Sequence, residues 1–85
     1  QSRSKIRVVF KHDFSEDVLL NIEHKNFVKD GRIMTFSSPE SFERIESKLS
    51  EFEPLLLEQF PLSLEEVFLE EMEGTDYDFS EIFKN

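Results

Sequence analysis

Hydrophobic and polar residues alternate near the start of the chain. In residues 5–12 the apolar Ile6, Val8 and Phe10 are separated by single positions, and only Val9 interrupts the polar side. A period of two with β-branched residues is typical of a half-buried β-strand. The pattern therefore predicts a strand over residues 5–12.

The next stretch allows two interpretations. Ser15 can cap a short helix that runs to Ile22, because a serine before the first turn accepts a hydrogen bond from a free backbone N–H. The alternative is a second strand over residues 18–23, since local propensity does not separate the two. We adopt the short helix as the prediction.

A hairpin signal follows at Asp30-Gly31. This dipeptide is typical of a two-residue turn that needs positive φ at both central positions, and strand-like residues flank it. The pairs that such a turn predicts are Lys29–Arg32, Val28–Ile33 and Phe27–Met34. Phe27, Met34 and Phe36 are then expected to share one face.

Ser38-Pro39 predicts the start of a longer helix, with the serine as N-cap and the proline at the first helical position. An apolar stripe at three- and four-residue steps follows, made by Phe42, Ile45, Leu49 and Phe52. Pro54 is expected to stop this helix. Residues 55–60, between two prolines, are predicted to form a strand.

Ser63 begins the best-specified helix of the sequence. Its hydroxyl can accept from the N–H of Glu66, whose carboxylate can reach back to the N–H of Ser63, which makes a capping box. Leu62 is placed to contact Val67 as a hydrophobic staple, and Gly74 is expected to end the helix. The apolar residues that follow the cap at helical spacing are Leu64, Val67, Phe68 and Met72.

These elements predict an α+β fold. Their order, with a short first helix, matches the small ferredoxin-like (split β-α-β) antiparallel sheet with helices on one face, followed by a C-terminal helix. We expect one α+β domain over residues 1–74 and an acidic, aromatic tail over residues 75–85. The final helix must bury its apolar stripe against this sheet, another copy or another domain.

Charge is distributed unevenly along the chain. Residues 1–48 hold nine Lys and Arg against eight Asp and Glu, whereas residues 49–85 hold one against eleven, for a net charge of −9. This charge disfavours binding to nucleic acid or anionic lipid. One interpretation of the negative charge is that acidic helix faces are exposed to solvent and keep the domain in solution. The alternative is that the acidic C-terminal part contacts a basic partner.

The residue types that most catalytic sites need are missing. The chain has no cysteine, and its two glycines, Gly31 and Gly74, have turn and cap positions, so no glycine-rich phosphate loop is present. His12 and His24 are the only histidines, and neither is spaced with a serine nucleophile. We therefore predict no catalytic, cofactor or metal site and no enzymatic activity in this stretch.

The run over residues 63–69, Ser-Leu-Glu-Glu-Val-Phe-Leu, resembles the closing signature of exporter-type ABC transporter ATP-binding subunits. Those chains often carry a small domain after the nucleotide-binding domain and end in a run like Pro-Ser-Leu-Glu-Glu-Ile-Phe-Leu. Leu62 stands where the family more often has its proline, which is displaced here to Pro61. More loosely, the likeness extends back to Ile6.

The resemblance implies a non-catalytic regulatory domain of a transport ATPase, with ATP and Mg bound upstream of Gln1 in the parent chain. Because the sequence begins with Gln1 rather than methionine, we expect a piece of a longer protein. The implied partners are the parent ATP-binding domain, its dimer mate (a possible homodimer) and a membrane permease. The implied location is cytoplasmic, at the inner face of the cell membrane.

The candidate interaction residues belong to the last helix and the tail. They are Leu64, Val67, Phe68 and Met72 in the helix, and Tyr77, Phe79 and Phe83 in the tail. The alternative function is a small-molecule-sensing regulatory domain on the same scaffold, which would need a pocket with convergent polar groups. An independent enzyme is the third and least favoured class.

Overall fold

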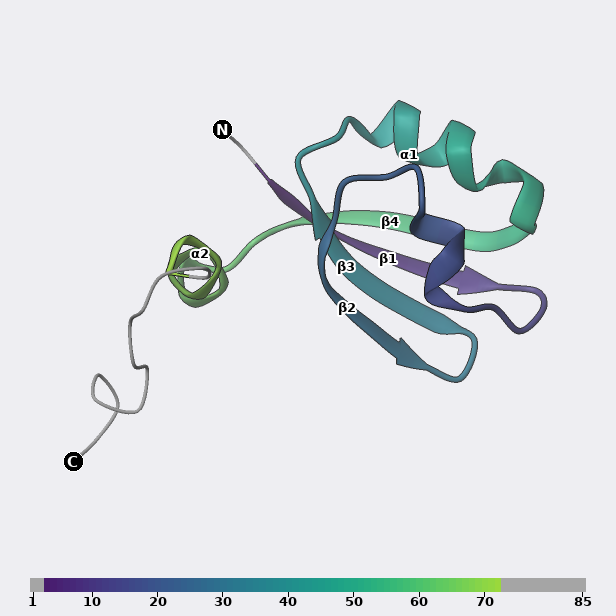
Figure 1. Ribbon diagram of the computed structural model, residues 1–85, viewed down its shortest axis with the longest axis horizontal. Coiled ribbons are helices and arrows are strands. Elements are labelled where there is room, and N and C mark those ends of the chain that lie inside the picture. The colour runs from purple at the N-terminus through teal and green to yellow at the C-terminus, as the bar shows by residue number, and fades with distance from the viewer. Residues whose placement is uncertain (1–2, 73–85) are drawn as a thin grey trace.

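Four strands form one antiparallel sheet in the computed structural model, which describes residues 3–72. The strands are β1 (Ser4–Phe10), β2 (Lys25–Asp30), β3 (Ile33–Ser38) and β4 (Pro54–Pro61). The helical elements are the 3-10 turns η1 (Glu16–Leu19) and η2 (Ser50–Phe52) and the helices α1 (Phe42–Leu49) and α2 (Leu64–Glu71). The order across the sheet is β2-β3-β1-β4 (Figure 1). The predicted α+β class is confirmed, and the strand order is consistent with a small ferredoxin-like fold.

The core lies on one face of the sheet. Its buried residues are Ile6, Val8, Phe10, Leu19, Ile22, Met34, Phe36, Ile45 and Leu49. Because η1 and α1 contribute to this single cluster, both lie on the same face of the sheet, as predicted. The alternation in β1 is confirmed, although this strand ends at Phe10, two residues earlier than expected.

The segment after β1 forms a single 3-10 turn. The Ser15 hydroxyl accepts a hydrogen bond from the Asp17 N–H at 3.3 Å, so the predicted cap is confirmed. The helix is shorter than predicted, and the strand alternative is wrong. One turn suffices here because it places Leu19 and, just beyond it, Ile22 in the core.

The β2–β3 turn has a different register from the predicted one. The observed pairs are Asp30–Ile33, Lys29–Met34 and Val28–Thr35. Gly31 and Arg32 are therefore the central residues, and of these only Gly31 has a positive φ, of 62°. A turn with glycine at its first central position has the twist that a tight hairpin needs. The predicted turn, centred on Asp30 and Gly31, is wrong.

The register change leaves the faces of the hairpin intact. Each predicted partner is displaced by two positions along β3, and side chains in a strand alternate with a period of two. Met34 and Phe36 are buried, and Phe27 packs against the same core, as predicted. The predicted pairing of Lys29 with the like-charged Arg32 does not form, because Lys29 is opposite Met34. Lys29 Nζ instead donates to Asp13 Oδ1 at 2.9 Å.

Ser41, rather than Ser38, caps α1. The Ser41 hydroxyl accepts from the Arg44 N–H at 3.2 Å. Ser38 is the last residue of β3, and its buried hydroxyl donates to the Glu23 carbonyl oxygen at 2.6 Å. The predicted cap is wrong because strand pairing holds Ser38 in the sheet, and Pro39 then lies in the connection to the helix.

The apolar stripe of α1 is confirmed at its centre. Ile45 and Leu49 are fully buried, whereas Phe52 lies in η2 and is 37% exposed. The chain leaves the helical layer at Glu53, whose φ is 57°, and Pro54 begins β4. The predicted strand is thus confirmed, with both flanking prolines included.

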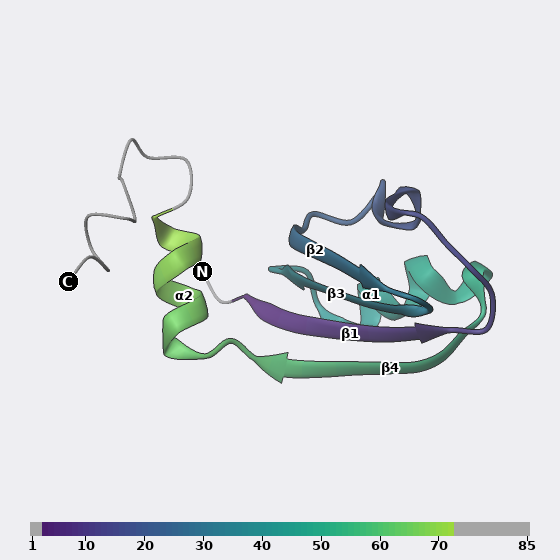
Figure 2. The same cartoon turned by 90° about the horizontal axis from the view of Figure 1, so that it is seen from below.

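The last helix, α2, begins after Ser63 as predicted, and its last residue is Glu71. It stands beyond one end of the sheet, with its axis across the strands (Figure 2). The predicted helix end at Gly74, the domain boundary at residue 74 and the tail over residues 75–85 lie outside the described residues.

Candidate interaction surface at the C-terminal helix

The start of α2 is held by the predicted capping box. The Ser63 hydroxyl accepts from the Glu66 N–H at 3.1 Å, and the Ser63 N–H donates to Glu66 Oε1 at 2.9 Å. The Ser63 N–H, together with the Lys5 ammonium 3.0 Å from Glu66 Oε2, holds the pKa of Glu66 below its usual value. Leu62 and Val67, the predicted staple residues, line one cleft.

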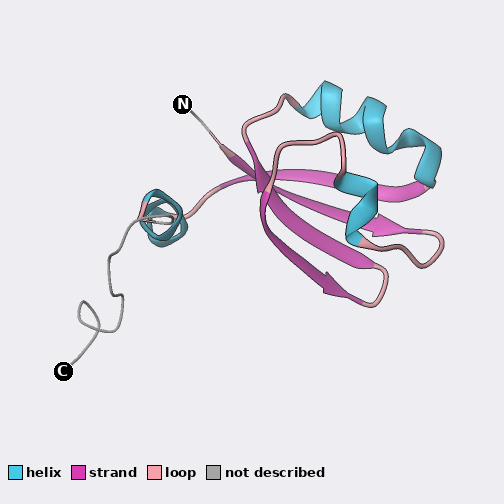
Figure 3. Cartoon of the chain, in the orientation of Figure 1, coloured by secondary structure: helices cyan, strands magenta, loops and turns pink. Residues whose placement is uncertain are grey.

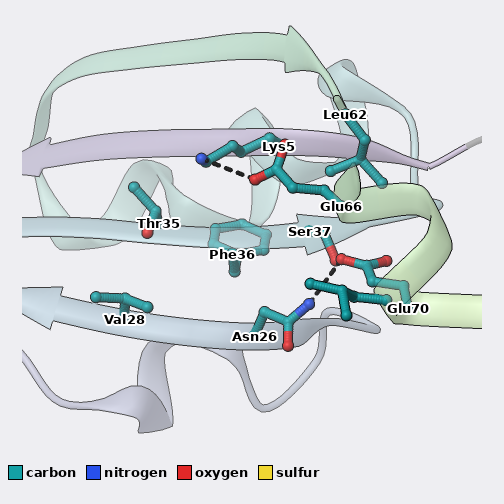
Figure 4. Close-up of a pocket in the computed structure, with 10 residues that line it drawn as sticks. Lys5, Asn26, Val28, Thr35, Phe36, Ser37, Leu62, Glu66 and Glu70 are labelled. Atoms are coloured by element: carbon teal, nitrogen blue, oxygen red, sulfur yellow. Dashed lines mark hydrogen bonds and ion pairs between the residues drawn. The ribbon is translucent and has the colours of Figure 1, made fainter. Parts of the chain in front are cut away.

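The side of α2 that faces the sheet is polar. Glu70 is 7% exposed, although it is a glutamate. Its carboxylate accepts from Arg3 Nε at 2.9 Å. It also accepts from Asn26 Nδ2 at 2.7 Å (Figure 4). Arg3 also donates to the carbonyl and hydroxyl oxygens of Ser37, each at 3.2 Å. A buried charge is tolerated when it is paired and hydrogen-bonded in this way.

Backbone geometry brings Asn26 to this contact. Asn26 has a φ of 59°, and it lies where the β2–β3 register shifts. Asparagine accepts the left-handed region more readily than most residues. A bulge turns its side chain towards α2, so an irregularity in β2 supplies one of the two partners of Glu70.

A cleft of about 400 Å³ separates α2 from the uncovered face of the sheet. Leu62 and Glu66 border it on one side, and Val28 and Thr35 on the other (Figure 4). Leu69 also lines this cleft. Because this space is open, the apolar residues of α2 do not interdigitate with the sheet. The polar contacts described above are therefore the principal links between the two.

The opposite side of α2 is apolar and faces solvent. Leu64 is 87% exposed and Phe68 is 41% exposed. Val67 and Leu69 lie between the two sides of the helix and are also partly exposed. A helix turns about 100° per residue, so Leu64 and Phe68 lie nearly opposite Glu66 and Glu70. The helix thus turns Glu66 and Glu70 towards the sheet and Leu64 and Phe68 towards solvent, where Glu65 and Glu71 are also exposed. An ordinary surface helix turns its apolar residues inward.

The uncovered face of the sheet adds a second apolar area. Val28, Leu56 and Phe60 are exposed on it. The strand pairing places Arg7 between Thr35 and Glu58 on this face, and Arg7 Nε lies 3.9 Å from Glu58 Oε1. This face is therefore mixed, whereas the outer side of α2 concentrates its apolar residues in one row.

The structure brings three of the predicted interaction residues together. Leu64, Val67 and Phe68 form the exposed side of α2, and Met72 is half-buried just after the helix. The remaining predicted residues, Tyr77, Phe79 and Phe83, lie outside residues 3–72.

Sequence reasoning missed the residues that orient the helix. These are Arg3, Asn26 and Glu70. One signal was present, because Glu66 and Glu70 are four positions apart and therefore share one helix side. That spacing could have indicated a charged side turned towards a cation.

The histidines have structural positions. His24 Nε2 lies 2.9 Å from Glu16 Oε2, and His24 Nδ1 lies 2.7 Å from the Ile22 carbonyl oxygen. Burial lowers the pKa of His24, but these two acceptors outweigh it and the pKa is raised. Within residues 3–72 no group of three or more His, Cys, Asp or Glu side chains is placed to hold a metal ion.

The chain matches no family model, no curated protein and no solved structure. The resemblance carried by residues 63–69 therefore stays a prediction. Among the helices of residues 3–72, none combines the length and the apolar character that crossing a bilayer requires.

Proposed function

We propose that this chain is a non-catalytic accessory domain of an ABC transporter ATP-binding protein and that it acts by contact. The outer side of α2, centred on Leu64 and Phe68, would dock against the ATP-binding domain, its dimer mate or the permease. One observation carries the proposal: α2 turns Glu66 and Glu70 to its own sheet and leaves Leu64 and Phe68 in solvent.

Burial of the exposed row would release substantial free energy. Covering a leucine or phenylalanine side chain is worth about 1.5–3 kcal/mol. An exposed apolar row lowers the solubility of a protein unless another surface covers it. Such patches therefore often mark sites of interaction. The plain alternative, in which Leu64 and Phe68 form part of the core of this domain, disagrees with their exposure.

The transporter context comes from the resemblance of residues 63–69. In that context, nucleotide binding and hydrolysis, with ATP and Mg, belong to the parent chain, and this domain modulates or assembles the motor. The domain would work in the cytoplasm, at the inner face of the membrane through its contact with the permease.

The test uses the full-length gene product purified with its transporter in mild detergent. We expect the double variant Leu64→Ser/Phe68→Ser to weaken co-purification or to change coupled ATP hydrolysis, with the domain still folded by circular dichroism. Leu20→Ser is the matched control, because Leu20 is 78% exposed but lies away from α2. Equal behaviour of the two variants would contradict the proposal, as would a gene that encodes no phosphate-binding loop upstream.

A second candidate is a small-molecule-sensing regulatory domain. The cleft between α2 and the sheet supports it, because Lys5, Asn26 and Ser37 contribute polar groups beside the apolar Val28 and Leu69. A thermal-shift screen of metabolites tests it, since a ligand at one hundred times its Kd raises the free energy of unfolding by about 2.7 kcal/mol. A strong shift that Thr35→Tyr, which fills the cleft, abolishes would favour this function over docking.

A further inference from the structure

Two carboxylates flank the exposed row of α2 and are not used within the domain. Glu66 and Glu70 are committed to Lys5, Arg3 and Asn26. By contrast, Glu65 and Glu71 are exposed, and their carboxylates have no hydrogen bond or ion pair within residues 3–72.

The two free carboxylates bracket the apolar residues. With about 100° per residue, Glu65 lies beyond Phe68 on one side of the Leu64–Phe68 pair, and Glu71 lies on the other side, between Leu64 and Val67. The outer surface of α2 therefore has Leu64 and Phe68 at its centre with a negative charge on each side of this pair, and Val67 lies beyond Glu71.

A small cleft extends this surface on the side of Glu71. It has a volume of about 360 Å³ and is bordered by Pro61, Leu62, Val67 and Glu71. Ser4 and the ion pair of Arg3 with Glu70 also line it. A cleft beside an exposed apolar row can receive a protruding anchor side chain, as in grooves that bind helices. The surface thus has a row, an anchor position and two charged margins.

We propose that the partner of this surface is a basic amphipathic helix from the cytoplasmic side of the permease. Such a helix supplies apolar residues to the row and Lys or Arg side chains to Glu65 and Glu71. The inference rests on the proposed function and deepens it. Cytoplasmic segments near membrane spans carry an excess of Lys and Arg, so the permease is the component whose charge is complementary.

Charge disfavours the other occupants. The outer side of α2 carries Glu65 and Glu71 and no basic residue, so two copies of α2 packed together would bring these carboxylates against one another. Juxtaposed like charges in an interface cost several kcal/mol. An anionic lipid surface would be repelled for the same reason.

The first experiment uses designed peptides as probes. One amphipathic helical peptide has leucines on one side and lysines at the margins, and a second carries glutamate in place of every lysine. We expect the basic peptide to bind the domain, to shift the NMR signals of α2, and to bind less tightly as salt is raised. Binding of both peptides alike, or shifts confined to other elements, would overturn the inference.

Charge reversal separates the two proposals. We expect Glu65→Lys/Glu71→Lys to lower the affinity for the basic peptide by at least about tenfold, because the variant replaces attraction between opposite charges with repulsion. The matched control is Glu43→Lys/Glu46→Lys on α1, two exposed positions away from α2. If Leu64→Ser/Phe68→Ser abolishes binding and the α2 charge reversal does not, the basic partner is wrong and docking stands. If neither variant matters, both proposals fail.

A photo-cross-link identifies the source of the partner. The residue Phe68 is replaced by p-benzoylphenylalanine in the full-length chain, expressed with its transporter. A cross-link to a basic cytoplasmic segment of the permease supports the inference. A cross-link to a second copy or to the ATP-binding domain overturns it and leaves the docking function in place, and no cross-link at all overturns both.

Discussion

The two α-helices begin alike and pack in opposite ways. Each is capped by a serine, Ser41 for α1 and Ser63 for α2, whose hydroxyl accepts from the N–H three residues later. Yet α1 buries Leu49 completely, whereas α2 buries Glu70 and leaves Leu64 in solvent. Figure 3 shows the consequence, with α1 against the sheet and α2 apart from it.

This contrast indicates that the helices have different duties. The free energy that holds α1 comes from apolar burial, which is shared with the sheet and lost only when the domain unfolds. What holds α2 is a cap and a few charged hydrogen bonds, which can open without disturbing the core. The less firmly attached helix, α2, is also the one with apolar side chains exposed and available for contact with a partner.

Truncating one leucine in each helix gives the largest expected difference. We expect Leu49→Ala to lower the free energy of unfolding by about 2–5 kcal/mol, because it leaves a cavity in the core. Leu64→Ala, at an exposed position, is expected to change it by less than about 0.5 kcal/mol. Urea denaturation of the domain measures both values. Similar losses in the two variants would mean that α2 belongs to the core.

Removing the buried glutamate tests how α2 is attached. Glu70→Ala leaves Arg3 and Asn26 without their shared acceptor, and we expect it to weaken the attachment of α2 by about 1–3 kcal/mol. Hydrogen exchange should show faster exchange in α2 and unchanged protection in β1 and β3. Glu71→Ala is the control, since its exposed carboxylate has no partner within residues 3–72. Uniform loss of protection across the sheet would argue against a separable helix.

The same substitution at each serine N-cap compares the two helices, because it removes the same capping hydrogen bond from each. Ser41→Ala and Ser63→Ala each cost about 1 kcal/mol of helix stability. For α1 we expect the whole cost in the global unfolding transition, because this helix is part of the core. For α2 we expect it only as local fraying, visible in amide exchange and not in the urea midpoint. A midpoint shifted equally by Ser63→Ala would remove the distinction.

The smallest expected effect is the pH dependence of α2. The pKa of Glu66 is lowered in the folded domain, so the ionised carboxylate stabilises the attachment of α2. This stabilisation is complete above the usual glutamate pKa near 4.5, and it is lost as the pH falls through the lowered pKa. We therefore expect α2 amides to lose protection as the pH falls below about 4.5, while the amides of the core stay protected. Lys5→Met should move this midpoint upward, since Lys5 helps to lower the pKa of Glu66. An unmoved midpoint would assign the transition to another group.

Features that depend on neighbours along the chain were predictable from the residues alone. The alternation of β1, the buried pair Ile45 and Leu49, and the capping box of Ser63 and Glu66 all involve contacts or periods within a few residues. Local sterics and backbone hydrogen bonding decide such features, so they hold in almost any fold that uses these elements.

Features that depend on distant partners were decided by the tertiary structure. Strand pairing with β1 retained Ser38 in the sheet, so the cap moved to Ser41. The orientation of α2 follows from Glu70 meeting Arg3, which is 67 positions away in sequence. A periodicity marks which residues of a helix share a side, but only the placement of such distant partners decides which side turns inward.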